Sequence, residues 1–242
     1  KQIHVEEDAG KLVHDDATNT SFVDYNRTSV PLIEIVSRPD FRSSDEVIAY
    51  LKKLKSSLQF AGISECEEGA MRCDVNISVR PEGSNELGVR SEIKNMSSLS
   101  EIKDAIEFEK VRHVDALERH TEMLVQETRR WDDAKGESVL MRSKEDAQDY
   151  RYFPEPDLVP IVVSDEWIEE IRKTIPMLQL ERKQKYINEY DLSAYDSEVL
   201  VKVKENSDFF QNCVDLGADP KKACNWVTGM LMGYLNETEL KI

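Results

Sequence analysis

A strict alternation of apolar and polar residues over positions 71–80 constrains the fold of this chain more than any other feature of the sequence. The apolar positions are Met71, Cys73, Val75, Ile77 and Val79. The intervening polar positions are Arg72, Asp74, Asn76, Ser78 and Arg80. Because successive side chains of a β-strand point to opposite faces, this period of two predicts a strand with one buried and one polar face.

A second alternating run, residues 89–94, follows the turn-forming segment 81–85. Two such runs joined by a short loop that contains glycine predict an antiparallel hairpin. Local patterns also predict four more strands, at 22–25, 31–37, 123–131 and 137–142, and two long helices, at 44–61 and 99–118. Each helix begins with a capping box, at residues 43–46 and 98–101 respectively.

After Val163 the pattern changes to a series of helices, interrupted at Pro176, at residues 192–193 and at 217–220. We therefore expect an α+β fold. It would consist of a mostly antiparallel-sheet domain, residues 1–163, and the beginning of an all-α domain, residues 164–242.

The charge balance limits the partners of the chain. It has 48 acidic and 32 basic side chains, a formal charge of −16. We therefore expect no broad basic surface that binds phosphate groups, although this charge balance does not exclude nucleic acid as a partner. No apolar run approaches the roughly 20 residues that span a bilayer, so no membrane partner is expected. The four widely spaced cysteines form no CxxC pair, which favours free thiols and a cytoplasmic location.

Acidic, amide and basic side chains share the polar face of the predicted hairpin. Asp74 and Glu92 are natural ligands for Mg²⁺, which proteins bind through one or two carboxylates together with phosphate oxygens. Arginine and lysine side chains beside them can neutralise phosphate charge. A surface ladder of cross-strand ion pairs would give the same pattern, so both interpretations stay open at this level.

Residues outside the hairpin carry weaker expectations. The acidic run 6–8 is expected to be exposed or to meet a cation. His113 and His120 lie seven residues apart on one predicted helix, and we expect both to face solvent. Trp131 and Trp226 are expected to anchor packing. The common phosphate-binding loops, GxGxxG and GxxxxGK followed by Ser or Thr, are absent from the sequence.

The two ends of the sequence suggest a piece of a longer protein. The chain begins with Lys1 in an amphipathic pattern, without Met or a signal-peptide core, and it ends shortly after an apolar helical pattern. We therefore expect further segments on both sides.

Seven strings along the chain resemble, in order, those of the B subunits of aspartyl/glutamyl-tRNA(Asn/Gln) amidotransferases (GatB). They are HVEEDAGK (4–11), VDYNRTSVPLIEIVSRPD (23–40), EEGAMRCDVNISVRP (67–81), GVRSEIKN (88–95), VQETRRWD (125–132), MRSKEDAQDYRYFPEPDLVP (141–160) and LSAYDSEVL (192–200). The resemblance covers nearly the whole chain, and only an N-terminal segment and a C-terminal tail of the family lack a counterpart.

The resemblance implies a ligase that corrects mischarged tRNA. With Mg²⁺ and ATP, the B subunit would phosphorylate the side-chain carboxylate of Glu-tRNA(Gln) or Asp-tRNA(Asn). Ammonia from glutamine, released in the amidotransferase's A subunit, would then displace the phosphate, and a small C subunit would hold the other two together. The fold would be a glutamine-synthetase-like cradle followed by a helical domain.

The resemblance also implies roles for individual residues. Asp74, Glu92 and Glu7 would bind the metal, and Glu7 would also be a catalytic acid at the mouth of the ammonia path. The remaining candidates, which would contact ATP or the reacting groups, are Arg72, Asn76, Arg90, Lys94, Asn95, Tyr150 and Arg151. Among them, Arg72, Arg90 and Lys94 would act on the phosphate groups during the reaction.

The chain departs from the family pattern at several places. Ser29 replaces a usual Gly, which affects a local turn, and Met96-Ser97-Ser98 replaces Leu-Asn-Ser. Without the family's other segments, this piece alone is expected to have little or no amidation activity. A scaffold or tRNA-binding module without catalysis is the alternative, although such a module has no need for Asp74 and Glu92 together. The sequence does not decide between Glu-tRNA and Asp-tRNA.

Overall fold

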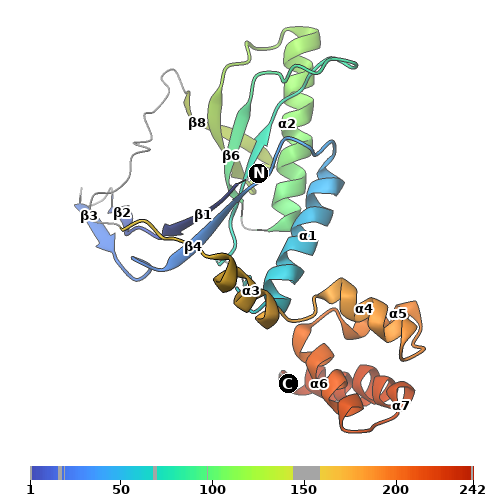
Figure 1. The fold of residues 1–242 in the computed structure, drawn as a ribbon. Coiled ribbons are helices and arrows are strands. Elements are labelled where there is room, and N and C mark those ends of the chain that lie inside the picture. The colour runs from blue at the N-terminus through green and yellow to red at the C-terminus, as the bar shows by residue number, and fades with distance from the viewer. Residues whose placement is uncertain are drawn as a thin grey trace. The chain divides into compact units, whose positions relative to one another are not determined.

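The computed structural model describes residues 2–15, 18, 20–67, 70–96, 98–143, 159–240 and 242. The chain forms two compact units, residues 1–43 and residues 44–242. The secondary structure confirms a mixed α and β fold (Figure 1). In the part of the chain that the structure describes, no helix is both long and apolar enough to cross a membrane.

The first unit contains two antiparallel two-stranded sheets. One pairs β1 (Gln2–Glu7) with β4 (Pro31–Val36), and the other pairs β2 (Lys11–Asp15) with β3 (Thr20–Asp24). The strands predicted at 22–25 and 31–37 are confirmed with small shifts of their ends. Although they are consecutive in the chain, they belong to different sheets.

A tight turn precedes β4. Ser29 has φ 64°, in the left-handed region that favours glycine. Its amide donates a hydrogen bond to the carbonyl oxygen of Asp8 at 3.0 Å, and the Asp8 amide donates to Val30 at 2.9 Å. Arg27 forms an ion pair with the Asp8 side chain at 2.7 Å. Ser29 therefore lies at a position where glycine would be the less strained residue.

The second unit is built on a four-stranded sheet in the order β5-β6-β7-β8. Its strands are β5 (Cys73–Ile77), β6 (Ser91–Met96), β7 (Glu127–Asp132) and β8 (Glu137–Ser143). The predicted hairpin is confirmed, because β5 pairs with β6 in antiparallel fashion. The pairing of β6 with β7 is parallel, so the sheet is mixed. Parallel neighbours need a crossover connection, which the helix between these two strands supplies.

Gly88, in the connection from β5 to β6, permits a close approach of two backbone segments. A Cβ atom at this position would lie 2.1 Å from the carbonyl oxygen of Val79. No side chain fits at that distance, so only glycine allows this path into β6.

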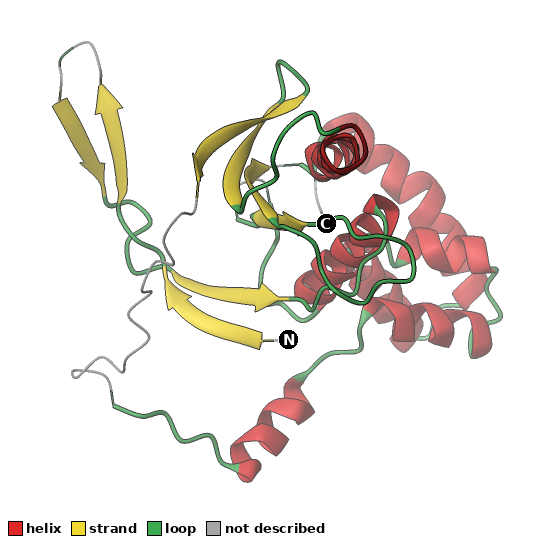
Figure 2. Cartoon of the chain, turned by 90° about the horizontal axis from the view of Figure 1, so that it is seen from above, coloured by secondary structure: helices red, strands yellow, loops and turns green. Residues whose placement is uncertain are grey.

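The helices α1 (Ser44–Phe60) and α2 (Leu99–Arg119) pack against each other, and α2 lies along the sheet (Figures 1 and 2). The capping box at the start of α2 is confirmed. Ser98 accepts a hydrogen bond from the Glu101 amide at 3.1 Å, and its own amide donates to the Glu101 carboxylate at 3.2 Å. Buried side chains of α1, α2 and the sheet form one apolar cluster, among them Leu51, Val75, Ile93, Met96, Ile102, Ala105 and Trp131.

The expectation that His113 faces solvent is wrong. The side chain is fully buried between α2 and the sheet. The buried stripe of α2 runs through Ile102, Ala105, Ile106, Glu109, His113 and Ala116, which is a continuous helical spacing. His120 ends the helix, and its side chain is exposed, as expected.

The rest of the second unit is helical, as predicted after Val163. Its elements are α3 (Asp165–Thr174), α4 (Gln179–Asn188), α5 (Ala194–Leu200), α6 (Lys204–Asp215), α7 (Pro220–Asn225), a π-helical segment (Trp226–Leu231) and α8 (Met232–Thr238). Helices end at the predicted interruptions. Ser164 caps α3, accepting a hydrogen bond from the Trp167 amide at 3.2 Å.

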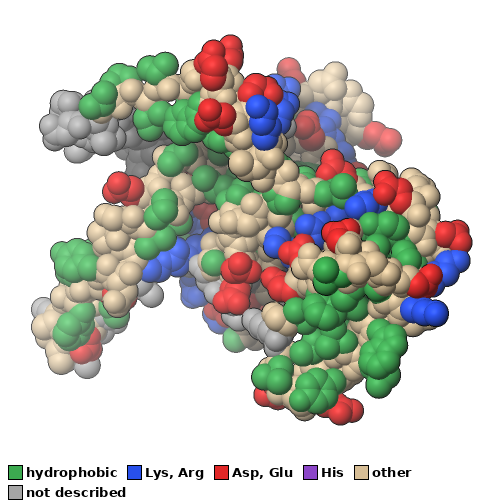
Figure 3. Space-filling model, turned by 60° about the horizontal axis from the view of Figure 1, so that its bottom comes forward, with side chains coloured by type: hydrophobic (Ala, Val, Ile, Leu, Met, Phe, Trp, Pro, Cys, Tyr) green, Lys and Arg blue, Asp and Glu red, His purple; other side chains and the backbone are tan. Residues whose placement is uncertain are grey.

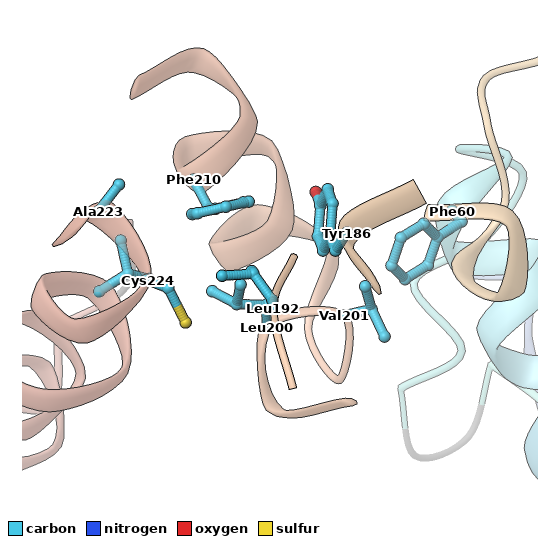
Figure 4. Packing of buried hydrophobic residues seen from close by; sticks show 9 residues of the cluster. Phe60, Tyr186, Leu192, Leu200, Val201, Phe210, Ala223 and Cys224 are labelled. Carbon is cyan, nitrogen blue, oxygen red and sulfur yellow. The ribbon is translucent and has the colours of Figure 1, made fainter. Parts of the chain in front are cut away.

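A second apolar cluster joins these helices to the end of α1 (Figure 4). The Tyr186 ring meets the edge of Phe210 at 4.8 Å between ring centroids, and Phe60 from α1 belongs to the same cluster. The Arg182 guanidinium lies over the Phe60 ring, 5.1 Å from its centroid. The helical core therefore includes the last residue of α1, and a domain boundary near Val163 stays a prediction.

The two tryptophans have different environments. Trp131 is 8% exposed and packs in the sheet cluster, so its role as an anchor is confirmed. Trp226 is 61% exposed, so the same expectation for Trp226 is wrong. The four cysteines are free thiols, of which Cys66 and Cys224 are buried.

Candidate functional site

The polar face of the sheet brings together side chains from three strands. The alternation predicted for β5 and β6 places Asp74 and Asn76 on one side of β5 and Val75 in the core. In the pairing of β5 with β6, Asn76 lies opposite Glu92. In the pairing of β6 with β7, Glu92 lies opposite Thr128. The face therefore combines carboxylate, amide and hydroxyl groups on a rigid framework.

Lys94 links the two candidate metal ligands. Its Nζ atom lies 2.7 Å from Oδ2 of Asp74 and 3.2 Å from Oε1 of Glu92. The partial burial of Lys94 acts to lower its pKa, but hydrogen bonds and negative charge from Asp74 and Glu92 outweigh this effect, so the pKa is raised. Two carboxylates from adjacent strands thus converge on one positively charged atom.

Thr128 holds the other oxygen of Glu92. Its hydroxyl donates a hydrogen bond to Oε2 at 3.1 Å, and the side chain is buried. The Glu92 carboxylate is therefore oriented by a neutral donor on one side and by Lys94 on the other. Sequence reasoning missed Thr128, because its position depends on the parallel pairing of two strands separated by a long helix.

The two candidate arginines lie apart. Arg72 immediately precedes β5 and Arg90 immediately precedes β6, and both are exposed. Because Cys73 pairs with Met96 and Ile77 pairs with Ser91, these arginines lie at opposite ends of the hairpin. The structure therefore brings Lys94 to the acid pair but does not place both arginines beside one another.

The other candidate residues lie elsewhere. Glu7 is an exposed residue at the end of β1, in the first unit, whereas Asp74 and Glu92 lie in the second. Asn95 lies in β6, but its side chain is outside the described part of the chain. Tyr150 and Arg151 also fall outside the described residues.

The convergence on Lys94 also tests whether these residues suit Mg²⁺. Asp74 and Glu92 already direct oxygen atoms at one cation, and Asp74 is about half exposed, which leaves room for water or phosphate oxygens. The described residues contain no group of three or more His, Cys, Asp or Glu side chains that could hold a metal ion by themselves. This pair suits Mg²⁺, which keeps several waters and takes one or two carboxylates plus substrate phosphates.

A buried network of charged and polar side chains joins the same strands to α2. The Arg112 guanidinium of α2 donates to Glu109 at 2.8 Å, to Glu127 of β7 at 2.8 Å and to Ser91 of β6 at 2.9 Å. It also donates to Glu122 at 2.9 Å. One arginine therefore connects α2 to both strands that carry Glu92 and Thr128.

Glu109 lies at the centre of this network and is fully buried. Ser138 donates a hydrogen bond to its carboxylate, and Arg129 forms an ion pair with it at 3.3 Å. Burial acts to raise the pKa of Glu109, but hydrogen bonds from His113, Arg112 and Ser138 and the charge of Arg112 lower it to about 2. The carboxylate is therefore ionised at neutral pH.

The signal for this network was present in the sequence. Glu109 and His113 occupy positions of α2 that continue its buried apolar stripe. A polar residue at such a position is expected to be buried and to form hydrogen bonds with other buried groups. Paired buried polar groups favour one arrangement of their elements, and here the bonds of Arg112 to Ser91 and Glu127 hold β6 and β7 against α2.

Charged side chains of both signs are scattered over the face drawn in Figure 3. On the face drawn in Figure 3, acidic and basic side chains are interspersed, and the basic ones form no continuous surface among the described residues.

Comparison with known proteins gives a consistent result. A family model described as "GatB/GatE catalytic domain" matches residues 1–169. The chain is 52% identical over 243 residues to the aspartyl/glutamyl-tRNA(Asn/Gln) amidotransferase B subunit of Caldicellulosiruptor saccharolyticus, covering 100% of this chain and 50% of the relative. The protein of the same name from Staphylococcus saprophyticus is 50% identical, with the same shares covered. The chain spans about half the length of the curated relatives it matches.

Proposed function

The chain belongs to the GatB/GatE family, and we propose that it carries catalytic residues of a tRNA-dependent amidotransferase, a ligase that forms a carbon–nitrogen bond. The observation that carries this proposal is the convergence of Asp74 and Glu92 on one cation, on a rigid sheet face. A scaffold without catalysis has no need for such a pair.

The proposed reaction has two steps. A side-chain carboxylate oxygen of Glu-tRNA(Gln) or Asp-tRNA(Asn) attacks the γ-phosphorus of ATP, which forms an acyl phosphate and releases ADP. Ammonia then attacks the acyl carbon, inorganic phosphate leaves with the C–O bond electrons, and the nitrogen loses a proton to give the amide. Phosphorylation is needed because it converts a poor leaving oxygen into a good one.

Residues of the sheet face have distinct roles in this proposal. Asp74 and Glu92 would hold Mg²⁺, and the ion would supply positive charge to the ATP phosphates. Lys94 lies beside both acids and is placed to bind phosphate oxygens. Asn76 is exposed on the same face and can donate an amide hydrogen bond to the nucleotide.

The remaining family-matched residues are assigned by resemblance. Arg72 and Arg90 would contact phosphate groups from opposite ends of the hairpin. In the conformation seen here, the two arginines would therefore contact different phosphate groups. Asn95 would contact the nucleotide. Glu7 would act where ammonia enters, and Tyr150 and Arg151 would border the aminoacyl end of the tRNA.

The proposed partners follow from the family as well. The amidotransferase's A subunit, a glutaminase, would supply ammonia from glutamine, and its C subunit would complete a heterotrimer. Because the chain spans about half of its relatives, we expect the 242 residues alone, given ATP and ammonia, to form little or no Gln-tRNA.

ATP cleavage by the full-length protein in its complex tests the proposal. With Mg²⁺ and Glu-tRNA(Gln), Asp74→Asn and Glu92→Gln should each lower the rate of ATP cleavage by about 10²–10³-fold, as when a group that stabilises transition-state charge is lost. Lys103→Met, which removes an exposed ion pair with Asp45 of α1, is the matched control and should leave the rate unchanged. Wild-type rates in both acid variants would overturn the assignment.

A further inference from the structure

We propose that Lys94 is the resident cation of the Asp74–Glu92 pair, which it leaves when a divalent metal ion binds there, and that its ammonium then binds the nucleotide phosphates. This inference rests on the proposed function. Lys94 would pair first with the two carboxylates and then with the nucleotide phosphates, so phosphate binding by Lys94 would depend on prior binding of the metal ion.

The first argument is geometric. The Lys94 ammonium contacts Oδ2 of Asp74 and Oε1 of Glu92, at 2.7 Å and 3.2 Å. The second oxygen of Glu92 accepts the hydrogen bond from Thr128. Lys94 therefore contacts one oxygen of each carboxylate, and on Glu92 it is the oxygen that Thr128 leaves. A divalent metal ion held by both carboxylates would compete with Lys94 for their negative charge.

The second argument concerns charge. Two carboxylates and one ammonium leave a net charge of about −1 at this place, so the lysine keeps the two acids from repelling each other. A divalent ion at the same oxygens would repel the ammonium strongly at such short distances. The two cations therefore compete, and the doubly charged one prevails when its concentration is sufficient.

The third argument concerns where Lys94 can go. Its side chain is about one-third exposed, and a lysine carries its charge on a flexible four-carbon stem. Arg130 lies opposite Lys94 in the β6–β7 pairing and offers it no negative charge. Among the described residues, the carboxylates that pair with Lys94 are those of Asp74 and Glu92. Once these are taken, the anion that the metal brings with it, the nucleotide triphosphate, is the available partner.

Mn²⁺ serves as the probe in the experiment. The full-length protein in its complex is titrated with Mn²⁺ by electron paramagnetic resonance, first without nucleotide. The site is defined as the binding lost in Asp74→Asn. Lys94→Met should bind Mn²⁺ at this site about tenfold more tightly than wild type, because a competing cation has been removed. Lys94→Gln, which keeps a polar side chain, should behave in the same way.

Arg130→Met is the matched control. It removes one positive charge from the neighbouring strand, but Arg130 pairs with Asp132 at 3.6 Å rather than with the two acids. Its effect on Mn²⁺ affinity should stay below about twofold, since exposed charges that are not in contact are screened. At saturating Mn²⁺, Lys94→Met should weaken the binding of a non-hydrolysable ATP analogue by about tenfold.

The outcomes separate the inference from the proposed function. Mn²⁺ affinity that is unchanged or lower in both Lys94 variants, with binding still lost in Asp74→Asn, overturns the role of Lys94 and leaves the metal site standing. An equal gain of Mn²⁺ affinity in Arg130→Met also overturns the role of Lys94, because the loss of any nearby positive charge would then explain the gain. Mn²⁺ binding that Asp74→Asn does not change overturns both.

Discussion

Thr128 donates a hydrogen bond from Oγ1 to Oε2 of Glu92 at 3.1 Å, across the parallel pairing of β7 with β6. The threonine is buried, so this donor is held in place, whereas a water molecule at the surface would not be. The bond turns the Glu92 carboxylate so that its other oxygen meets Lys94. Thr128 is therefore a positioning residue of the candidate metal site.

Thr128→Val should weaken Mn²⁺ binding at the Asp74–Glu92 site by about tenfold, because a hydrogen bond to a charged group contributes roughly 1.5–3 kcal/mol. Valine keeps the shape of the buried side chain and removes the hydroxyl. Thr128→Ser keeps the hydroxyl and should retain most of the affinity. Equal losses in both variants would mean that the methyl group matters instead, and Mn²⁺ titration distinguishes these results.

Glu109→Gln should destabilise the protein by about 3 kcal/mol at neutral pH, because it removes the buried charge that Arg112 and Arg129 neutralise. Glu118→Gln, an exposed change on the same helix, is the control and should stay within about 0.5 kcal/mol. Urea denaturation measures both. A loss as small as that of the control would show that the network contributes little to stability.

The low pKa of Glu109 predicts that the free energy of unfolding depends on pH. The pKa of Glu109 is about 2 in the folded protein, against an ordinary value of 4.5, so its contribution is complete above the higher value. It is lost as the pH falls from about 4.5 towards 2, because the unfolded chain takes up the proton first. The difference in free energy of unfolding between wild type and Glu109→Gln should shrink over this range. A difference that stays constant with pH would contradict the low pKa.

Local sequence patterns predicted most of the elements around the site. The alternation over 71–80 and the capping box of α2 depend on neighbouring residues; the capping box is found in the structure, and the strand covers the middle of the alternating run, Cys73–Ile77. The parallel pairing of β6 with β7 is a long-range contact, which no local pattern encodes. Thr128 was therefore missed as a partner of Glu92, even though the strand that carries it was predicted.

Two environments were predicted wrongly for a related reason. His113 is expected to face solvent with His120, seven residues away, but its spacing places it on the buried stripe of α2. Trp226 was assigned to the core because it is large and apolar, although it is exposed. Residue type alone therefore does not decide whether either side chain is buried.

Gly88→Ala should destabilise the second unit by about 2–4 kcal/mol, as expected when a close contact must be relieved by moving backbone. The added Cβ would lie 2.1 Å from the Val79 carbonyl oxygen. Gly229→Ala is the control, because a Cβ there meets nothing within 4 Å and the residue is helical. It should be neutral or stabilising by up to about 1 kcal/mol. Thermal unfolding would show the contrast, and equal melting temperatures would contradict the close approach at Gly88.

The two tryptophans should respond differently to truncation. Trp131 packs against the edge of Phe108 with ring centroids 6.0 Å apart, inside the sheet cluster, so Trp131→Ala should cost about 3–5 kcal/mol. Trp226→Ala should change the free energy of unfolding by less than about 0.5 kcal/mol, because the side chain is largely exposed.

Trp131→Phe separates the role of the ring from that of the indole N–H. The Nε1 atom is buried and has no hydrogen-bond partner among the described residues, so removing it leaves no other group unpaired. Trp131→Phe should therefore cost clearly less than Trp131→Ala in urea denaturation. Equal costs for the two variants would show that the packing of Trp131 depends on the full width of the indole ring.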